Sequence, residues 1–327
     1  IVIPCYNSSR SIREVIETAA AEMDRLGRTP FEFVLVDDHS PDGGATAREL
    51  RALADDYPYV KAIELAQNAG QHNAIMAALN YAEGDIIISM DDDLQTHPSQ
   101  FHVLLDEIDK GYDIVYGYYP DKKHSGFRNL GSRFNSWSVR VLIGKPKDMK
   151  TSSFWVIRKF VRDYVIQYKN PYSYMQGLFL RTTQNISCVP IEHHERVYGT
   201  SNYTLSKLIH LWSNIVGFSV VPLRIARHIG FVLSAGGLLG ALWVLIRKLL
   251  HPNMQLGYAS TMVAIFFFAG VILLFLGLIG EYVGRMFLCM GSAPQYVVKT
   301  VYSGAAKNEK DPGEPGTEQY RSKEKIE

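Results

Sequence analysis

The chain has 327 residues, room for about two domains, and its 34 basic and 33 acidic side chains leave a net charge of +1. That balance argues against a nucleic-acid-binding protein, which would carry a basic excess, and three widely spaced cysteines exclude a disulfide scaffold. Charged residues make up 20% of the chain but are almost absent from residues 229–280, which disfavours a fully soluble protein.

Strand-like and helix-like segments alternate before residue 200. Apolar runs typical of buried strands occupy residues 1–4, 31–36, 60–65, 85–90 and 113–118, and helical patterns occupy residues 11–26, 45–57, 71–83 and 99–110. This alternation predicts the α/β class, with a parallel sheet covered by helices on both faces. Because ligands of such sheets bind where the strands end, the residues after each strand are the candidates for a site.

Polar and acidic residues follow four of these strands. They are Pro4-Cys5-Tyr6-Asn7, Asp37-Asp38-His39-Ser40-Pro41-Asp42, Gln67-Asn68-Ala69-Gly70-Gln71-His72 and Asp91-Asp92-Asp93-Leu94-Gln95. The sequence has neither a G-x-x-x-x-G-K-[ST] phosphate loop nor a G-x-G-x-x-G dinucleotide fingerprint after the first strand. We therefore expect one composite site at the strand ends that is neither a P-loop nor a dinucleotide fold.

The acidic triplet is the sharpest of these signals. Three adjacent carboxylates repel one another, and a divalent cation such as Mg²⁺ or Mn²⁺ removes that repulsion. Alternation along an extended chain would place Asp91, Asp93 and Gln95 on one side. Asp92 would then point the other way. We expect the first three side chains to hold a metal; a solvated acidic turn is the alternative.

Asp37 and Asp38 occupy the same position after their own strand. One of them could bind a base or ribose, as acidic residues do at the strand ends of nucleotide-binding folds. The alternative is that Asp38 or Ser40 only caps the helix expected to start near Gly43.

Two long uncharged segments follow. Residues 229–246 would span about 27 Å as a helix, close to the thickness of a bilayer core, and residues 254–280 form the second run. His251-Pro252-Asn253 separates them as a helix-breaking turn, which predicts a membrane hairpin with both ends on one side. Basic residues at the outer ends favour cytoplasmic termini. A pair of buried core helices is the alternative.

Two further segments flank this hairpin. Residues 204–228 place apolar side chains at helical spacing between basic ones, which predicts amphipathic helices in the membrane interface; a surface helix packed on the soluble domain is the alternative. Residues 301–327 are rich in charges and should form a disordered tail. The predicted domains are therefore a catalytic domain at 1–203, interface helices at 204–228, two membrane helices with an extension at 229–300, and the tail. A fragment ending near residue 203 should then fold and bind nucleotide.

The motifs together resemble glycosyltransferase family 2, and most closely its polyprenyl-phosphate glycosyltransferases. The residues that carry the resemblance are Pro4-x-Tyr6-Asn7, Val36-Asp37-Asp38-x-Ser40-x-Asp42, Asn68-x-Gly70-x-x-x-Ala74 and Asp91-x-Asp93-Leu94-Gln95-x-x-Pro98, followed by the hairpin. The resemblance implies a GT-A fold, which is Rossmann-like, and inverting transfer of a sugar from a nucleotide sugar to a polyprenyl phosphate such as undecaprenyl phosphate. It also implies an integral protein of the cytoplasmic (inner) membrane with a cytoplasmic catalytic domain. The product would be a lipid-linked sugar donor for cell-envelope glycans. UDP is favoured over GDP, and a homotetramer is implied.

The same resemblance assigns roles to individual residues. The nucleotide pocket would contain Pro4, Tyr6, Asn7, Asp38, Asn68 and Asp92, and the metal would be held by Asp91, Asp93 and Gln95. Arg128-x-x-x-Ser132 resembles the element that binds the acceptor phosphate, and Arg196-x-x-Gly199-x-Ser201 resembles an arginine-containing loop before the interface helices. Arginine suits phosphate because its planar fork donates two hydrogen bonds at once, although a surface ion pair is the alternative for each arginine. The catalytic set is then Asp91, Asp93, Arg128, Ser132 and Arg196.

Two segments depart from the family pattern. Ser201-Asn202-Tyr203 stands where the family often has Ser-Lys-Tyr, and Ser152-Ser153-Phe154-Trp155 stands where it often has Gly-Asp-Phe-Arg. The acidic role sometimes assigned to the second segment is therefore in doubt, with Asp148 as a substitute. No general base is assigned, since a phosphate nucleophile is already anionic at neutral pH.

Two other functions share part of this pattern. A processive polysaccharide synthase would use the same nucleotide-sugar motifs, but this chain lacks the Gln-x-x-Arg-Trp of such enzymes and has few membrane segments. A non-catalytic membrane scaffold that binds nucleotide is the other alternative, and the intact acidic triplet with Gln95 argues against it.

Overall fold

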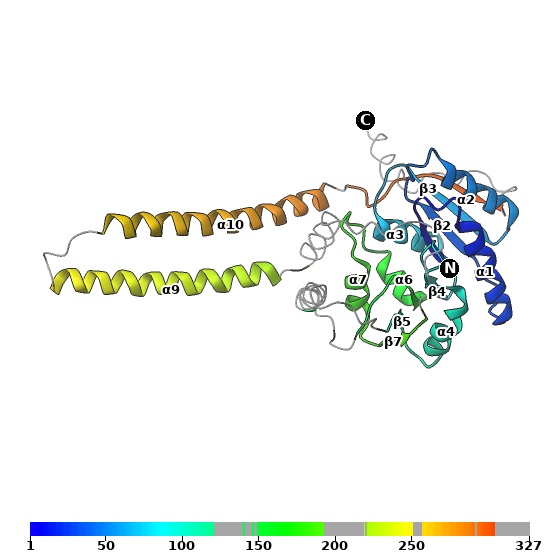
Figure 1. The fold of residues 1–327 in the computed structure, drawn as a ribbon, viewed down its shortest axis with the longest axis horizontal. Coiled ribbons are helices and arrows are strands. Elements are labelled where there is room, and N and C mark those ends of the chain that lie inside the picture. Colours follow the sequence, from blue (N-terminus) through cyan, green and yellow to red (C-terminus); the bar gives the residue numbers. More distant parts are fainter. Residues whose placement is uncertain are drawn as a thin grey trace, which may run out of the picture.

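The computed structural model describes residues 1–120, 140, 146, 149–192, 219, 221–250, 257–291 and 293–304. It consists of an α/β domain from which two long helices project side by side (Figure 1). The α/β class and the order of its first strands and helices therefore agree with the prediction from sequence.

The elements follow one another along the chain in this order. The first half contains β1 (Val2–Cys5), α1 (Ile12–Arg25), β2 (Phe33–Asp37), α2 (Ala45–Asp56), β3 (Val60–Leu65), α3 (Gln71–Tyr81), β4 (Ile86–Ser89), the short 3-10 helix η1 (Pro98–Gln100), α4 (Phe101–Asp109) and β5 (Ile114–Tyr118). The second half contains β6 (Trp155–Arg158), α6 (Lys159–Val165), α7 (Met175–Thr182), β7 (Ile186–Pro190), α9 (Val221–Leu250), α10 (Tyr258–Met290) and β8 (Val298–Ser303).

The described strands form one sheet in the order β7-β5-β6-β4-β1-β2-β3-β8. Strands β1 to β4 are mutually parallel where they pair, as expected, but the sheet as a whole is mixed. Strand β6 lies antiparallel between β4 and β5, and β8 pairs antiparallel with the outer edge of β3. The expectation of an all-parallel sheet is therefore wrong for these two strands.

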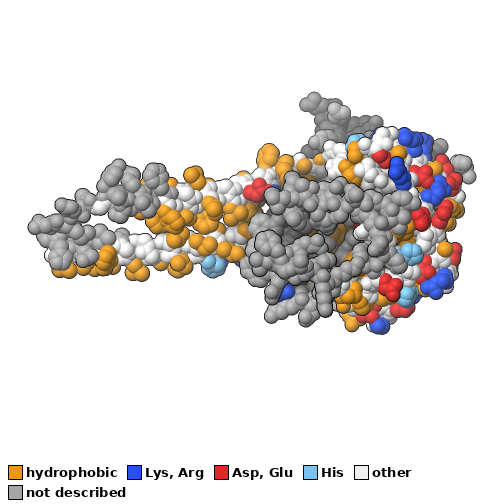
Figure 2. All heavy atoms as spheres, viewed as in Figure 1, with side chains coloured by type: hydrophobic (Ala, Val, Ile, Leu, Met, Phe, Trp, Pro, Cys, Tyr) orange, Lys and Arg blue, Asp and Glu red, His pale blue; other side chains and the backbone are white. Residues whose placement is uncertain are grey.

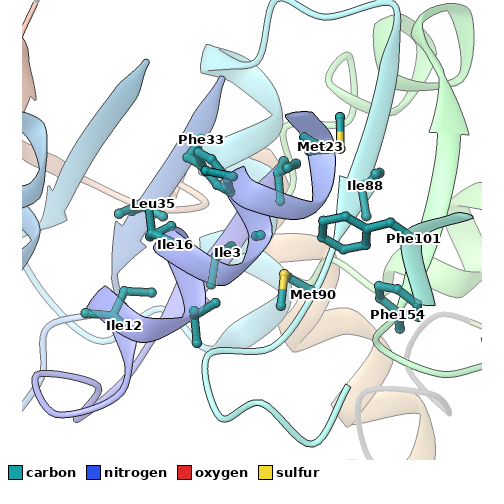
Figure 3. Packing of buried hydrophobic residues seen from close by; sticks show 14 of the residues in the cluster. Ile3, Ile12, Ile16, Met23, Phe33, Leu35, Ile88, Met90, Phe101 and Phe154 are labelled. Carbon is teal, nitrogen blue, oxygen red and sulfur yellow. The ribbon is translucent and has the colours of Figure 1, made fainter. Parts of the chain in front are cut away.

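Helices cover both faces of the sheet. On one face α1, α2 and α4 pack against Ile3, Phe33 and their neighbours, and Figure 3 shows side chains of α1 facing the sheet there. On the other face α3, α6 and α7 cover Val34 and Val36. Because successive residues of a strand point to opposite faces, a strand covered on both sides must be apolar throughout. This explains why β2 reads Phe-Val-Leu-Val before its terminal Asp37.

Helices α9 and α10 form the expected hairpin and return the chain to the α/β domain (Figure 1). Their apolar side chains are exposed, for example Phe231 and Phe287 at 74% each, and Figure 2 shows them along both helices. Among the described helices, the stretch Phe267–Met290 alone is long and apolar enough to cross a membrane by length and composition. The other expected span, 229–246, lies within α9, which also includes the expected interface segment from Val221 onward without a break.

The chain beyond the hairpin belongs to the α/β domain. Strand β8 pairs with β3 from Lys61↔Ser303 to Leu65↔Val298, and Lys299 forms an ion pair with Glu64. The predicted boundaries, a catalytic domain ending at 203 and a disordered tail beginning at 301, therefore omit one strand of the sheet. Residues 305–327 of that tail, and residues 204–218 of the expected interface helices, lie outside the described residues.

Candidate active site

The sheet opens between β1 and β4, and this opening locates the site. β1 pairs with β2 at every position from Val2 to Cys5, but it pairs with β4 only at Val2↔Ser89. Pro4 has no N–H to donate on the β4 side, so it is tolerated where that pairing has ended. The chain continues from β1 to β2 on one side of β1, whereas β4 lies on its other side. Ligands of α/β sheets bind where the strand order reverses in this way, so a ligand site is expected here. Tyr6 and the acidic triplet flank it.

The loop after β1 is held by the acidic triplet. The backbone N–H of Tyr6 donates to Ser8 Oγ at 2.8 Å and to Asp92 Oδ2 at 3.2 Å, and the Ser8 hydroxyl also donates to Asp92. The Asn7 amide donates to Ser40 Oγ at 3.0 Å, which joins this loop to the one after β2. The Tyr6 side chain is 50% exposed. It therefore presents a free aromatic surface at the crevice.

Asp92 faces this loop and not the solvent. Burial raises the pKa of its carboxyl, while the hydrogen bonds from Ser8 and Tyr6 oppose that rise. Burial also raises the pKa of the Cys5 thiol, and the Asp92 charge adds to the rise. Asp92 thus organises the first loop through its side chain, a contribution different from direct contact with a nucleotide.

Asp38 fixes the loop after β3. Its Oδ1 accepts from the Ala69 amide at 2.7 Å and its Oδ2 accepts from the Gly70 amide at 2.9 Å. Gly70 has φ +84° and ψ 153°, a conformation open essentially to glycine alone. Asn68 is exposed, and its side-chain amide donates to the Asp38 carbonyl at 3.1 Å. Any nucleotide contact by Asp38 would therefore use lone pairs that these amides leave free.

The helix after β2 is capped by Asp42, and not by Asp38 or Ser40. Asp42 accepts from the Ala45 amide at 3.0 Å and the Thr46 amide at 2.9 Å. Asp37 instead accepts from the Ser40 amide at 3.1 Å, and burial raises its pKa. The alternative in which Asp38 or Ser40 caps this helix is therefore wrong.

Asp91 and Asp93 occupy the other side of the triplet. Gln71 Nε2 at the start of α3 donates to Asp91 Oδ1 at 3.0 Å, and the Ser153 hydroxyl before β6 donates to Asp91 Oδ2. The pKa of Tyr119 is raised first by burial and then by the charges of both Asp91 and Asp93. Asp91 is thus held by α3 and by the segment before β6, while Asp92 faces the β1 loop.

The chain does not stay extended as far as Gln95. It bends after Asp91, Leu94 has φ +58°, and the Gln95 amide donates back to Asp93 Oδ1 at 3.1 Å. The prediction that Gln95 shares a side with Asp91 and Asp93 assumed an extended backbone, and the backbone is not extended here. Sequence reasoning included Gln71 among the strand-end residues and Ser153 in the segment that departs from the family pattern, but it assigned neither of them a contact with Asp91. It missed Ser8, which no pattern marks.

Backbone strain gathers at the same edge of the sheet. The non-glycine residues with positive φ in the described chain are Asn7, His39 and Leu94, at +60°, +53° and +58°. They follow β1, β2 and β4 respectively. Each such conformation costs on the order of 1–2 kcal/mol and persists where the surroundings dictate it, as at functional sites. The strain therefore points to the same three loops as the polar side chains do.

Asp91 and Asp93 fit a divalent cation whose remaining ligands are waters and substrate phosphates. In the described part of the chain, no three His, Cys, Asp or Glu side chains are grouped so as to enclose a metal. Mg²⁺ typically binds through one or two carboxylates together with waters and substrate phosphates. Asp91 and Asp93 match that donor set, with oxygen ligands only. The predicted residues Arg128, Ser132 and Arg196, and also Asp148, lie outside the described residues.

His72, next to Gln71 on α3, gives the site a pH-dependent component of stability. Its ring meets that of Tyr174 edge-on at 5.5 Å, and its buried Nδ1 has no hydrogen-bond partner among the described residues. Burial lowers its pKa from 6.5 to about 4. The unfolded chain therefore binds the proton first as the pH falls. The stability that neutral His72 contributes is full above about pH 6.5 and is lost toward pH 4.

We expect His72→Gln to weaken this acid sensitivity. At pH 5 the wild type should lose about 2 kcal/mol of stability from this residue, and the variant should not. Thermal unfolding of the detergent-solubilised protein between pH 7 and pH 5 measures the difference. His102→Gln on α4 serves as the control. Identical pH dependence in wild type and His72→Gln would contradict the assignment.

Comparisons with known proteins agree with this geometry. The profile described as Glycosyl transferase family 2 matches residues 1–173, and that described as GtrB C-terminal hairpin matches residues 221–286. Two undecaprenyl-phosphate 4-deoxy-4-formamido-L-arabinose transferases are similar over 92% of the chain. The one from Serratia proteamaculans is 30% identical, with 93% of its length covered, and the one from Edwardsiella ictaluri is 32% identical, also with 93% covered.

Comparison with solved structures found weaker similarities. Glucosyl-3-phosphoglycerate synthase from Mycobacterium tuberculosis, in complex with Mn²⁺, UDP-glucose and glycerol 3-phosphate, has 17% sequence identity and a TM-score of 0.46, covering 66% of this chain and 76% of that one. On the family match and the full-length relatives, the chain belongs to glycosyl transferase family 2, carries the GtrB-type hairpin, and is a glycosyltransferase.

Proposed function

We propose that this glycosyltransferase moves a sugar, with inversion, from a UDP-linked donor to a polyprenyl phosphate of the undecaprenyl type at the cytoplasmic face of the inner membrane. The observation that carries the proposal is that one chain joins acidic strand-end loops, in which three non-glycine residues have positive φ, to a hairpin with exposed apolar side chains. The names of the full-length relatives supply the acceptor, since both are undecaprenyl-phosphate transferases. The product would serve as a lipid-linked sugar donor for cell-envelope glycans.

The chemistry follows from the charges on both substrates. An oxygen of the lipid phosphate attacks the anomeric carbon and forms the new C–O bond, while the bond from that carbon to the nucleotide diphosphate breaks and the diphosphate leaves. The nucleophile is already anionic, so no general base is required. Asp91 and Asp93 would hold Mg²⁺ or Mn²⁺, which supplies charge stabilisation to the leaving diphosphate. Tyr6 and Asn68 are exposed at the crevice and would line the nucleotide pocket.

The hairpin would deliver the acceptor. Its exposed apolar side chains would lie in the bilayer. The chain returns from α10 to the α/β domain (Figure 1), and this connection would keep the lipid phosphate close to the strand ends. Arg128, Ser132 and Arg196 would bind that phosphate. A homotetramer would place several such hairpins together.

Arg128→Ala should weaken acceptor use selectively. One charge-assisted hydrogen bond is worth about 1.5–3 kcal/mol, so its loss should raise the apparent KM for polyprenyl phosphate roughly ten- to a hundredfold. Arg128→Lys should rescue only part of this, because a point charge cannot reproduce the bidentate fork. Steady-state kinetics and calorimetry with UDP measure the two substrates separately. Lost UDP affinity with unchanged acceptor dependence would place Arg128 in the donor site.

Nucleotide release tests the function as a whole. The purified protein is incubated with a panel of UDP- and GDP-sugars, with and without undecaprenyl phosphate. We expect release of UDP from one sugar, dependent on the lipid, together with a glycolipid product of inverted configuration. Polymer made without lipid would support a polysaccharide synthase, and no release from any donor would support a non-catalytic scaffold.

A further inference from the structure

The segment 170–174, called here the tether loop, lies between the membrane hairpin and the start of α3. From the hairpin side, the Arg285 guanidinium of α10 stacks over the Tyr172 ring at 4.7 Å. Gln295, which follows α10 and is only 8% exposed, donates from Nε2 to the Asn170 carbonyl at 3.0 Å. Both contacts come from the C-terminal part of α10 and the segment that follows it.

The same loop is tied to the first turn of α3. Asn73 Nδ2 donates to the Pro171 carbonyl at 3.0 Å and to the Ala69 carbonyl at 2.9 Å, and the Ser173 hydroxyl donates to Asn73 Oδ1. One amide side chain therefore joins the tether loop to the loop that carries Gly70.

The first turn of α3 in turn holds the acidic triplet, because Gln71 Nε2 donates to Asp91 Oδ1 at 3.0 Å. Hydrogen bonds, one cation–π contact and the backbone of the first turn of α3 thus connect α10 with Asp91. The contacts at Asn73 and Gln295 are partly buried and the last one, at Gln71, is exposed, so a displacement at α10 has a physical path to the carboxylate.

We propose that the tether loop couples the hairpin to the acidic triplet, with Gln295 and Asn73 as positioning residues that set the place of Asp91. A hairpin that holds the lipid acceptor then also fixes the group that binds the metal on the donor. The inference rests on the proposed function for the role of Asp91, but the coupling itself is a property of the protein alone.

Hydrogen exchange of the full-length protein in lipid nanodiscs, without ligands, tests the coupling. Gln295→Leu keeps the side-chain volume but removes the donor, and Asn73→Ala removes the link to the tether loop. Each should speed exchange about five- to tenfold in peptides covering 67–74 and 91–97, as expected for the loss of one hydrogen bond from a locally opening unit. Asn80→Ala is the matched control. Its Nδ2 donates to the Met76 carbonyl on the same helix and its Oδ1 accepts from Lys169 Nζ at 3.3 Å, so it lies beside the tether loop but is not in the series that leads to Asp91.

Faster exchange confined to 170–174 and 293–297, with 91–97 unchanged in Gln295→Leu, overturns the proposal. This distant variant decides the question even if Asn73→Ala fails to fold. A second measurement follows Mn²⁺ binding by electron paramagnetic resonance in the presence of UDP, where both variants should raise the apparent Kd about five- to tenfold. If the wild type itself binds no Mn²⁺, the proposed metal role of Asp91 fails, and the exchange data still decide the coupling.

Discussion

Asp93→Asn should lower the turnover of sugar transfer by about a thousandfold or more and leave the unfolding temperature unchanged. The neutral amide cannot balance the charge of a divalent cation, so the leaving diphosphate loses its stabilisation. The fold should survive because an Asn oxygen can still accept the Gln95 amide, which donates to Asp93 Oδ1 at 3.1 Å. Turnover with labelled donor and thermal unfolding measure these two quantities, and Mn²⁺ titration measures whether the variant still binds the cation.

Asp92→Asn is the control, since it changes the neighbouring carboxylate in the same way. Asp92 faces Tyr6 and Ser8, and burial already raises its pKa, so removing its charge relieves a desolvation cost. One Asn oxygen can still accept from the Tyr6 amide. Turnover should therefore stay within about tenfold of wild type. Equal losses of turnover in both variants, with normal unfolding, would contradict the assignment of Asp93 to the metal and Asp92 to the β1 loop.

Cutting the chain after Tyr203 should destabilise the α/β domain by about 3–5 kcal/mol, in contrast to the expectation from sequence alone. The cut removes β8 and with it the ladder along β3 and the hydrogen bond from the Ala66 amide to the Val297 carbonyl at 2.8 Å. It also exposes the edge of β3, which favours aggregation. Denaturant unfolding and light scattering of the fragment measure both effects.

A second variant separates the strand from the membrane. In it, a flexible Gly/Ser linker replaces residues 204–292, so that β8 is kept and the hairpin is lost. This protein should fold and bind UDP, yet transfer to long-chain undecaprenyl phosphate should fall at least about a hundredfold because nothing presents the lipid. A 1–203 fragment as stable as this variant would contradict the structural role of β8, and unchanged transfer would contradict the role of the hairpin.

The sequence predicts the first half of the sheet well, for a physical reason. β1, β2 and β4 are largely buried on both faces, so each is a nearly continuous apolar run, whereas β3 includes the half-buried Lys61 and Glu64 between its apolar residues. The helices between these strands show their own period. β6 and β8 escaped prediction because local pattern does not specify a pairing partner. Nothing in the run Trp155–Arg158 indicates that it inserts between β4 and β5. Val298–Ser303 pairs with a strand more than 200 residues earlier in the chain.

The same distinction applies to the site. Its location followed from strand ends and adjacent carboxylates, which are local features. The partners of those carboxylates did not, because any serine or glutamine can donate a hydrogen bond and only the fold decides which one is near. Ser153 reaches Asp91 across 62 positions of sequence. Asp42, and not Asp38, caps α2 because Gly43 and Gly44 turn the chain with φ +67° and +79° before the helix starts.

The position of β8 also has a consequence for how the protein is made. Synthesis proceeds from the N-terminus at about 5–20 residues per second, so the ribosome completes β3 long before it reaches Val298. The whole hairpin is synthesised between those moments, and only afterwards can the last strand pair with β3. Until then the edge of β3 stays unpaired and the loop beyond it lacks the Val297 contact. The sheet is therefore completed only in chains whose hairpin has already been synthesised.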